Sequence, residues 1–269
     1  MTVNNTKINP TISPKILALD FDGVVCDGLI EYFEVAWRTY CQIWKPSNNT
    51  PSANLAQRFY NLRPVIETGW EMPVLIKALI DGFTDEEILQ NWANITPQIL
   101  AANQLESSVI MKKLDGLRDE WIEKDLDSWL SLHKFYPGVI ERLKKTIESE
   151  VKIFIVTTKE SRFVKQLLQR EGLELADTAI FGKEVKRPKY ETLRGLIAQE
   201  KIKDENLWFI EDRIKTLELV KKQSDLGDVK LFLADWGYNT QSEREAGKDD
   251  DRIQLISLDQ FSQDFSMWL

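Results

Sequence analysis

The chain has 269 residues, of which 43% are hydrophobic, so it can form one large domain or two smaller ones with a substantial core. Its formal net charge of −8 argues against partners such as nucleic acid or an anionic membrane surface. Two cysteines and a single histidine exclude a disulfide scaffold, a four-cysteine zinc site and a multi-histidine metal site. Carboxylates, lysines and hydroxyls remain as candidates for chemistry.

Residues 1–14 are polar, contain two prolines and carry little charge. They have neither the basic start nor the apolar run of a signal peptide, and no later apolar run approaches the length of a membrane span. We therefore expect a disordered tail at the start of a cytoplasmic protein.

The first predicted strand is the apolar run 16–19, which ends in polar residues and a glycine. From residue 28 to residue 134 no further strand is indicated. Apolar spacing there predicts helices at 31–40, 55–62, 74–79, 86–91, 108–114 and 121–130. Six of the nine tryptophans lie in this stretch, which is enough aromatic volume for a small core. We expect an all-helical domain over 28–134.

After residue 134, short apolar runs alternate with helical patterns. The predicted strands are 151–156, 179–181, 207–210, 229–234 and 253–256, and the predicted helices are 139–148, 162–170, 190–199 and 214–221. Repeated strand–helix units form parallel sheets covered on both faces. The sequence thus predicts an α/β protein whose Rossmann-like core, residues 15–27 and 135–269, is interrupted by the inserted helical domain.

Polar residues stand where the predicted strands end, and ligands of open parallel sheets bind beyond those carboxyl ends. The residues suited to that edge are Asp20, Asp22, Thr157, Lys189, Glu211 and Asp212. Carboxylate oxygens suit Mg²⁺, and lysine and hydroxyl groups suit phosphate oxygens. The pattern therefore predicts a site for Mg²⁺ and a phosphate group.

Four segments together resemble the motifs of the haloacid dehalogenase superfamily, specifically its phosphatase branch with a helical cap inserted after the first motif. They are Asp20-Phe21-Asp22-Gly23, Ile155-Val156-Thr157-Thr158-Lys159, Arg187-Pro188-Lys189 and Phe209-Ile210-Glu211-Asp212. Tyr136-Pro137-Gly138 resembles the usual return from the cap to the core. The order of the motifs around a helical insert makes 15–27 and 135–269 the catalytic core and 28–134 the cap, in a layout like that of phosphoglycolate phosphatases.

The resemblance implies a role for each motif residue. Asp20 would be the nucleophile that forms an aspartyl-phosphate, and Asp22 would be the general acid and then the general base. Thr157 and the backbone N–H of Thr158 would bind the phosphoryl group, and Lys189 would offset its charge. Because family dehalogenases and phosphonatases lack an acid at the position of Asp22, this residue favours a phosphatase or a phosphomutase.

The resemblance also implies a Mg²⁺ site formed by Asp20, Asp212 and the backbone carbonyl of Asp22. The fourth motif departs from the usual pattern, because Glu211 precedes Asp212 and Thr216 stands where a further aspartate often falls. Three roles stay open for Glu211: a metal ligand, a contact through water, or a residue that shapes the site.

Within the cap, Arg63 and Glu67 are the candidates for recognising the substrate; the alternative is a surface salt bridge. Asp27 is expected to cap the first cap helix. The leading hypothesis is a Mg²⁺-dependent phosphomonoester hydrolase for a small phosphorylated metabolite. The alternatives are a phosphomutase acting on a sugar phosphate and a non-catalytic binding protein on the same fold.

Overall fold

The structure, a computed structural model, describes residues 13–269. The predicted tail 1–14 lies outside the described residues except for Ser13 and Pro14. Contacts divide the chain into two compact units, which are treated separately below. The first unit contains the chain up to Asp27 together with Phe135–Leu269, and the second contains Gly28–Lys134.

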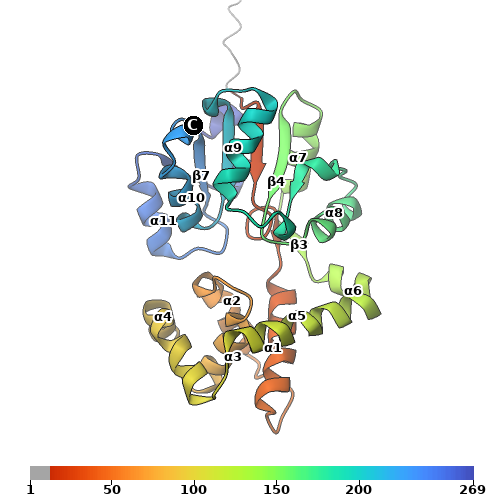
Figure 1. Cartoon of the computed structure of the whole chain (residues 1–269), viewed down its shortest axis with the longest axis vertical. Helices are drawn as coiled ribbons and strands as arrows, with labels where there is room; N and C mark the ends of the chain where they lie inside the picture. Colours follow the sequence, from red (N-terminus) through yellow and green to blue (C-terminus); the bar gives the residue numbers. More distant parts are fainter. Residues whose placement is uncertain (1–12) are drawn as a thin grey trace, which may run out of the picture. The chain divides into compact units, whose positions relative to one another are not determined.

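The first unit is built on a six-stranded sheet with the order β5-β4-β1-β6-β7-β8, in which every paired strand is parallel (Figure 1). The strands are β1 (Ile16–Leu19), β4 (Lys152–Val156), β5 (Ile180–Phe181), β6 (Leu207–Glu211), β7 (Lys230–Ala234) and β8 (Ile253–Ile256). A separate two-stranded sheet pairs β2 (Cys26–Asp27) with β3 (Lys134–Phe135). The predicted parallel α/β core is confirmed.

Side chains alternate along each strand, so both faces of the large sheet carry apolar side chains that pack against other parts of the unit. On one face Phe209 of β6 packs in a cluster with Leu196 and Leu217 from two helices. On the other face Trp208 contacts the rings of Phe232 and Trp268. The helices of this unit are α7 (Val139–Ile147), α8 (Ser161–Arg170), α9 (Lys189–Glu200), α10 (Ile214–Lys221), α11 (Gln241–Lys248) and α12 (Leu258–Phe261).

The second unit contains helices between Leu29 and Ser131 that are joined by loops. Its helices are α1 (Leu29–Trp44), α2 (Leu55–Leu62), α3 (Glu71–Ile80), α4 (Asp85–Ala102), α5 (Ser107–Lys124) and α6 (Leu126–Ser131). The prediction of one helix over 121–130 is wrong. The helical conformation is interrupted at Asp125, which separates α5 from α6. Its side chain caps α6 by accepting a hydrogen bond from the backbone N–H of Ser128 at 2.9 Å. The expectation of no strand over residues 28–134 also misses Lys134, the first residue of β3.

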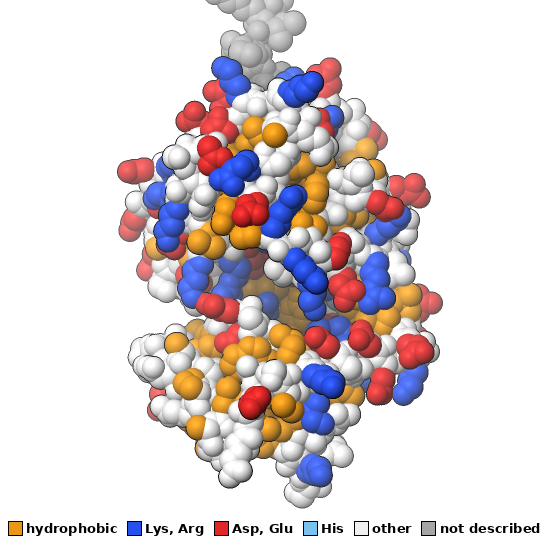
Figure 2. Space-filling model, viewed as in Figure 1, with side chains coloured by type: hydrophobic (Ala, Val, Ile, Leu, Met, Phe, Trp, Pro, Cys, Tyr) orange, Lys and Arg blue, Asp and Glu red, His pale blue; other side chains and the backbone are white. Residues whose placement is uncertain are grey.

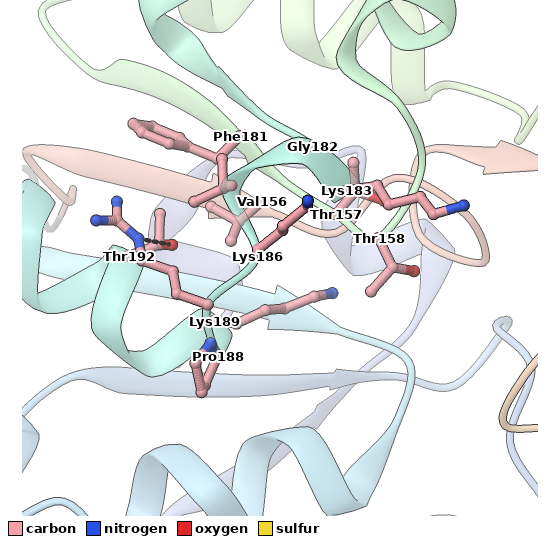
Figure 3. A pocket seen from close by; sticks show the side chains of 12 residues that line it. Val156, Thr157, Thr158, Phe181, Gly182, Lys183, Lys186, Pro188, Lys189 and Thr192 are labelled. Atoms are coloured by element: carbon pink, nitrogen blue, oxygen red, sulfur yellow. Dashed lines mark hydrogen bonds between the residues drawn. The ribbon is translucent and has the colours of Figure 1, made fainter.

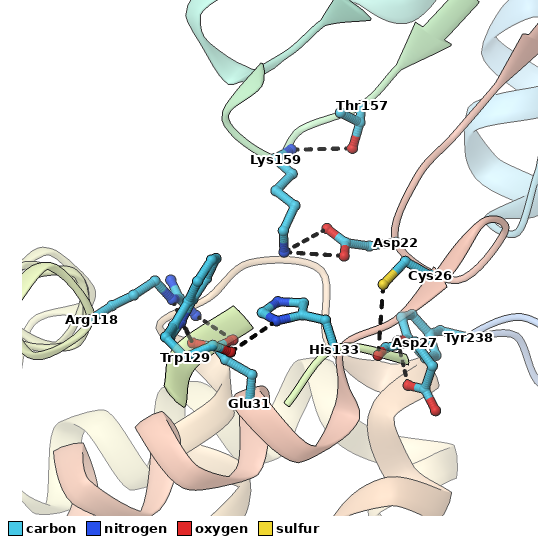
Figure 4. Close-up of polar contacts among 10 residues, drawn as sticks. All are labelled: Asp22, Cys26, Asp27, Glu31, Arg118, Trp129, His133, Thr157, Lys159 and Tyr238. Carbon is cyan, nitrogen blue, oxygen red and sulfur yellow. Dashed lines mark hydrogen bonds and ion pairs between the residues drawn. The ribbon is translucent and has the colours of Figure 1, made fainter. Parts of the chain in front are cut away.

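A buried ion pair holds α1 and α5 of the second unit together (Figure 4). Glu31 is fully buried, and Arg118 Nε donates a hydrogen bond to its Oε1 at 2.8 Å. Trp129 Nε1 donates to the same oxygen at 3.0 Å. A buried charge is tolerated when its polar atoms are paired, so this network explains a carboxylate inside a helical core.

Acidic and basic side chains are interspersed on the face of the molecule seen in Figure 2. The net charge of −8 is thus not gathered into one acidic field on that face. Within residues 13–269, none of the helices combines the length and the apolar character needed to span a membrane.

Candidate active site

The register of the sheet brings the polar ends of three strands to one edge. Leu19 of β1 is paired with Ile155 of β4 and with Ile210 of β6. Asp20 therefore stands level with Glu211, and Thr157 follows one position beyond. The backbone N–H of Asp20 donates to the carbonyl of Ile210 at 2.9 Å and extends the ladder past the end of β1.

Lys189 links two of these carboxylates. It is the first residue of α9, and its Nζ lies 2.8 Å from Asp20 Oδ1 and 2.6 Å from Glu211 Oε2. Glu211 Oε1 accepts a hydrogen bond from the backbone N–H of Arg213 at 3.1 Å. Both oxygens of Glu211 are thus engaged by the protein, so Glu211 can orient the amine of Lys189 toward Asp20.

Close backbone packing fixes Asp212. A Cβ at Gly23 or at Gly237 would overlap atoms of Asp212, and Gly23 also has a φ of +92°, which favours glycine. The backbone N–H of Tyr238 donates to Asp212 Oδ2 at 2.7 Å, and Asn239 Nδ2 donates to the Asp212 carbonyl at 2.9 Å. Asp212 is therefore held by the chain on both sides.

These carboxylates fit a divalent cation. One oxygen from each of Asp20, Glu211 and Asp212 lies within 4.8 Å of the others, and all three residues are buried. Burial raises the pKa of Asp20 to about 7, with a further contribution from the charge of Glu211 and an opposing one from Lys189. Burial likewise raises the pKa of Glu211 to about 7. Three buried carboxylates beside one lysine carry excess negative charge, and a cation bound there would offset that charge.

The other candidate aspartate, Asp22, is paired with a lysine that the sequence reasoning did not select (Figure 4). Lys159 Nζ lies 3.2 Å from Asp22 Oδ1, and both side chains are mostly buried. The backbone N–H of Lys159 donates to Thr157 Oγ1 at 3.2 Å. The loop after β4 therefore connects the phosphate-binding candidate Thr157 to the proton-transfer candidate Asp22. The only signal for Lys159 in the sequence is its place directly after Thr157-Thr158.

A cavity of about 290 Å³ adjoins this cluster in the first unit (Figure 3). Thr157, Thr158 and Lys189 are among the residues that line it, so the three predicted phosphate-binding residues share one space. Thr157 is buried beside the end of β4, whereas Thr158 is exposed.

Arg63 and Glu67, the predicted substrate-recognition residues, lie in the second unit. Arg63 Nη1 donates to the Ile66 carbonyl at 2.9 Å, and the backbone N–H of Glu67 donates to Glu71 Oε2 at 2.8 Å. These contacts tie both residues to the turn between α2 and α3, and their proposed role in recognising substrate stays a prediction.

The expected capping role of Asp27 is wrong. The N-cap of α1 is Gly28, and Asp27 Oδ1 instead accepts a hydrogen bond from Tyr238 Oη at 2.8 Å (Figure 4). This bond joins β2 to the loop that holds Asp212, because Tyr238 also donates its backbone N–H to that carboxylate. Asp27 thus supports the loop that holds Asp212.

Comparisons with solved structures identify proteins of similar fold. The chain resembles the crystal structure of a predicted phosphatase from Clostridium acetobutylicum (TM-score 0.56, 14% identity, 93% of this chain and 97% of that one). It also resembles a predicted phosphoglycolate phosphatase from Haemophilus somnus (TM-score 0.54, 14% identity, 84% and 88%) and a hydrolase from Pseudomonas syringae (TM-score 0.52, 14% identity, 91% and 94%). At these identities the likeness concerns the fold.

No curated protein matches the sequence. A sequence model of one family, described as haloacid dehalogenase-like hydrolase, matches residues 77–223, which is more than half of the chain. The matched stretch includes Thr157, Lys189, Glu211 and Asp212, four of the residues gathered at the sheet edge. The chain is therefore an enzyme that belongs to the haloacid dehalogenase-like hydrolase family.

Proposed function

We propose that the protein is a Mg²⁺-dependent phosphomonoester hydrolase that acts on a small phosphorylated metabolite through an aspartyl-phosphate. The observation that carries this proposal is the position of Asp20. Its buried carboxylate stands at the end of a central strand, 2.8 Å from Lys189 and within 4.8 Å of two further carboxylates. A nucleophile, a fixed cation and a set of oxygen ligands are what transfer of a phosphoryl group requires.

In the first step, one oxygen of Asp20 forms a bond to phosphorus while the bond from phosphorus to the leaving oxygen breaks. The bonding electrons move to the leaving oxygen, and Asp22 gives that oxygen its proton. Lys159, 3.2 Å from Asp22, positions the carboxyl group for this transfer.

In the second step, Asp22, now a carboxylate, accepts a proton from water as the water oxygen attacks phosphorus. The bond between phosphorus and Asp20 breaks, and its electrons return to the carboxylate. Inorganic phosphate leaves, and Asp20 and Asp22 regain their starting forms.

The remaining residues of the site would bind the phosphoryl group and Mg²⁺. Thr157 and Lys189 would bind the oxygens of the phosphoryl group, together with the backbone N–H of Thr158. Asp20, Asp212 and the backbone carbonyl of Asp22 would hold Mg²⁺, which supplies positive charge beside the phosphoryl oxygens when bound. We assign Glu211 to orienting Lys189, because the protein engages both of its oxygens.

Steady-state release of phosphate from p-nitrophenyl phosphate tests the proposal, with and without Mg²⁺. Asp20→Asn removes the nucleophile and keeps the shape, so we expect the rate to fall by about 10³-fold or more. Asp225→Asn is the matched control, because Asp225 is exposed and pairs with Arg194 on the protein surface. Release that persists in Asp20→Asn, or that needs no Mg²⁺, would contradict the proposal. Isomerisation of a sugar phosphate without net release would replace the hydrolase with a phosphomutase.

A further inference from the structure

The cavity beside Thr157 and Lys189 extends well beyond those two residues (Figure 3). It continues along the loop that runs from β5 to α9 and includes η3, the short helix Lys183–Val185. A volume of about 290 Å³ is close to that of a small-molecule site and exceeds what one phosphoryl group fills. The cavity therefore has room for a second part of the ligand.

The charged side chains that line the cavity are all positive. Lys183, Lys186, Arg187 and Lys189 line it, and its lining within residues 13–269 includes no aspartate or glutamate. Two of these cations are already engaged, because Lys189 pairs with the catalytic carboxylates and Arg187 Nε donates to Thr192 Oγ1 at 3.0 Å.

Lys183 and Lys186, in contrast, form no ion pair with any carboxylate of the described chain. Both side chains are exposed to solvent and line the hollow beside Thr157 and Lys189. The positive charge of the hollow is thus available to an anion from solution.

The loop that carries these lysines is fixed in place. A Cβ at Gly182 would lie 2.6 Å from the Lys159 carbonyl oxygen, and the backbone N–H of Lys183 donates to that same oxygen at 2.9 Å. Lys186 has a φ of +50°, a left-handed conformation that glycine adopts at lower cost. A lysine at a position that favours glycine keeps a long cationic side chain beside the cavity (Figure 3).

We propose that this cavity binds a second anionic group of the substrate, a phosphate or a carboxylate, with Lys183 and Lys186 as its principal contacts. The inference rests on the proposed function, because it places the reacting phosphoryl group at Thr157 and Lys189. The preferred substrates are then phosphomonoesters that carry a second anion within reach of η3, that is, bisphosphates or phosphorylated carboxylic acids.

Binding of non-hydrolysable probes tests this without turnover. Propylphosphonate, propane-1,3-bisphosphonate and 4-phosphonobutyrate would be titrated calorimetrically into the full chain at saturating Mg²⁺, with alkane bisphosphonates of one to four carbons to cover the span. We expect the wild type to bind at least one of the two-anion probes about tenfold more tightly than propylphosphonate. If the bisphosphonates bind more tightly than the phosphonocarboxylate, the second anionic group of the substrate is a phosphate; if the phosphonocarboxylate binds more tightly, it is a carboxylate.

Lys186→Gln and Lys183→Gln should each reduce this preference, Lys186→Gln to about twofold or less. Lys201→Gln is the matched control, because Lys201 is exposed, has a similar φ of 52° at the end of α9, and does not line the cavity. It should keep the wild-type preference.

Equal binding of one-anion and two-anion probes by the wild type, or an unchanged preference in Lys186→Gln, would overturn the proposal. Failure of every probe to bind would overturn it too. Failure of the proposed hydrolase is distinguishable, since it would leave the binding preference intact and abolish only the release of phosphate.

Discussion

The excess negative charge at the end of β1 predicts that removing Asp20 makes the metal-free protein more stable. Asp20 is buried with Glu211 and Asp212, and its pKa is raised from 3.8 to about 7. Keeping this carboxylate ionised in the folded protein therefore opposes folding. Asp20→Asn replaces the charge with a neutral group of the same size, so the free energy of unfolding should increase although catalysis is lost.

The magnitude and the pH range follow from the two pKa values. Well below pH 4 the carboxyl is protonated in the folded and unfolded states, and the free energies of unfolding of the wild type and the variant should be similar. Between pH 4 and 7 the unfolded chain releases the proton and the folded protein keeps it, so wild-type stability falls as the pH rises. The difference between the two pKa values of Asp20 corresponds to about 4 kcal/mol of unfolding free energy. Because Glu211 shares the electrostatic repulsion, we expect Asp20→Asn to be more stable than the wild type by about 2–4 kcal/mol at pH 8.

Thermal unfolding in EDTA at pH 4, 6 and 8 measures this effect. At pH 8 we expect the Tm of Asp20→Asn to exceed that of the wild type by about 4–12 °C, and the difference should vanish toward pH 4. Mg²⁺ should reduce the Tm difference between Asp20→Asn and the wild type, because it stabilises the wild type. The control Asp225→Asn should shift stability the other way, because Arg194 lowers the pKa of Asp225. A Tm at pH 8 that is equal to or below the wild-type value would refute the reasoning.

Three further substitutions test other parts of the account. Gly237→Ala should lower the affinity for Mg²⁺ and the activity by about tenfold or more, because the new Cβ would displace Asp212. Calorimetric titration of Mg²⁺ measures the affinity, and an affinity equal to that of the wild type would contradict the prediction. Arg118→Met should destabilise the protein by about 3–5 kcal/mol in urea unfolding, since it leaves Glu31 buried without its cation; a loss below about 1 kcal/mol would count against the buried pair. Gly116→Ala should instead stabilise α5 by about 0.5–1 kcal/mol in the same assay, because no atom obstructs the new methyl group, and any destabilisation would show a hidden constraint.

The strands were predictable because parallel strands are buried on both faces and read as continuous apolar runs. All four residues of β1 are fully buried, and its predicted bounds agree with the structure. Two helices after residue 240 escaped the apolar pattern. The helix α11 is mostly exposed and has little apolar periodicity, but Thr240 and Glu243 form a capping box that its sequence contains. A search for capping residues would have found it.

The same limit explains the error at 121–130. The apolar spacing continues across residue 125, so periodicity alone predicts one helix. Asp125 is a preferred helix-capping residue, and in the structure its carboxylate starts α6 by accepting the N–H of Ser128. The capping hydrogen bond of Asp125 therefore ends one helix and starts another, although the apolar spacing is continuous.

At the site, residues that stand at strand ends were predictable and their supporting contacts were not. Asp20 and Thr157 follow strands, Glu211 is the last residue of one, and the register of the three strands places these residues together. The pairing of Lys159 with Asp22 joins residues 137 positions apart through a loop side chain, and no local pattern indicates it. The need for glycine at Gly237 is equally tertiary, because it depends on how closely another strand's end approaches.

The central claim is that Asp20 carries the phosphoryl group, and rapid acid quenching tests it most directly. The protein would be mixed with Mg²⁺ and a ³²P-labelled phosphate ester, quenched within milliseconds, and digested for mass spectrometry. We predict an acid-stable, hydroxylamine-sensitive label on the peptide that contains Asp20, present in the wild type and in Asp225→Asn and absent from Asp20→Asn. A label on another residue, or phosphate release by the wild type with no covalent label at any quench time, would contradict the account.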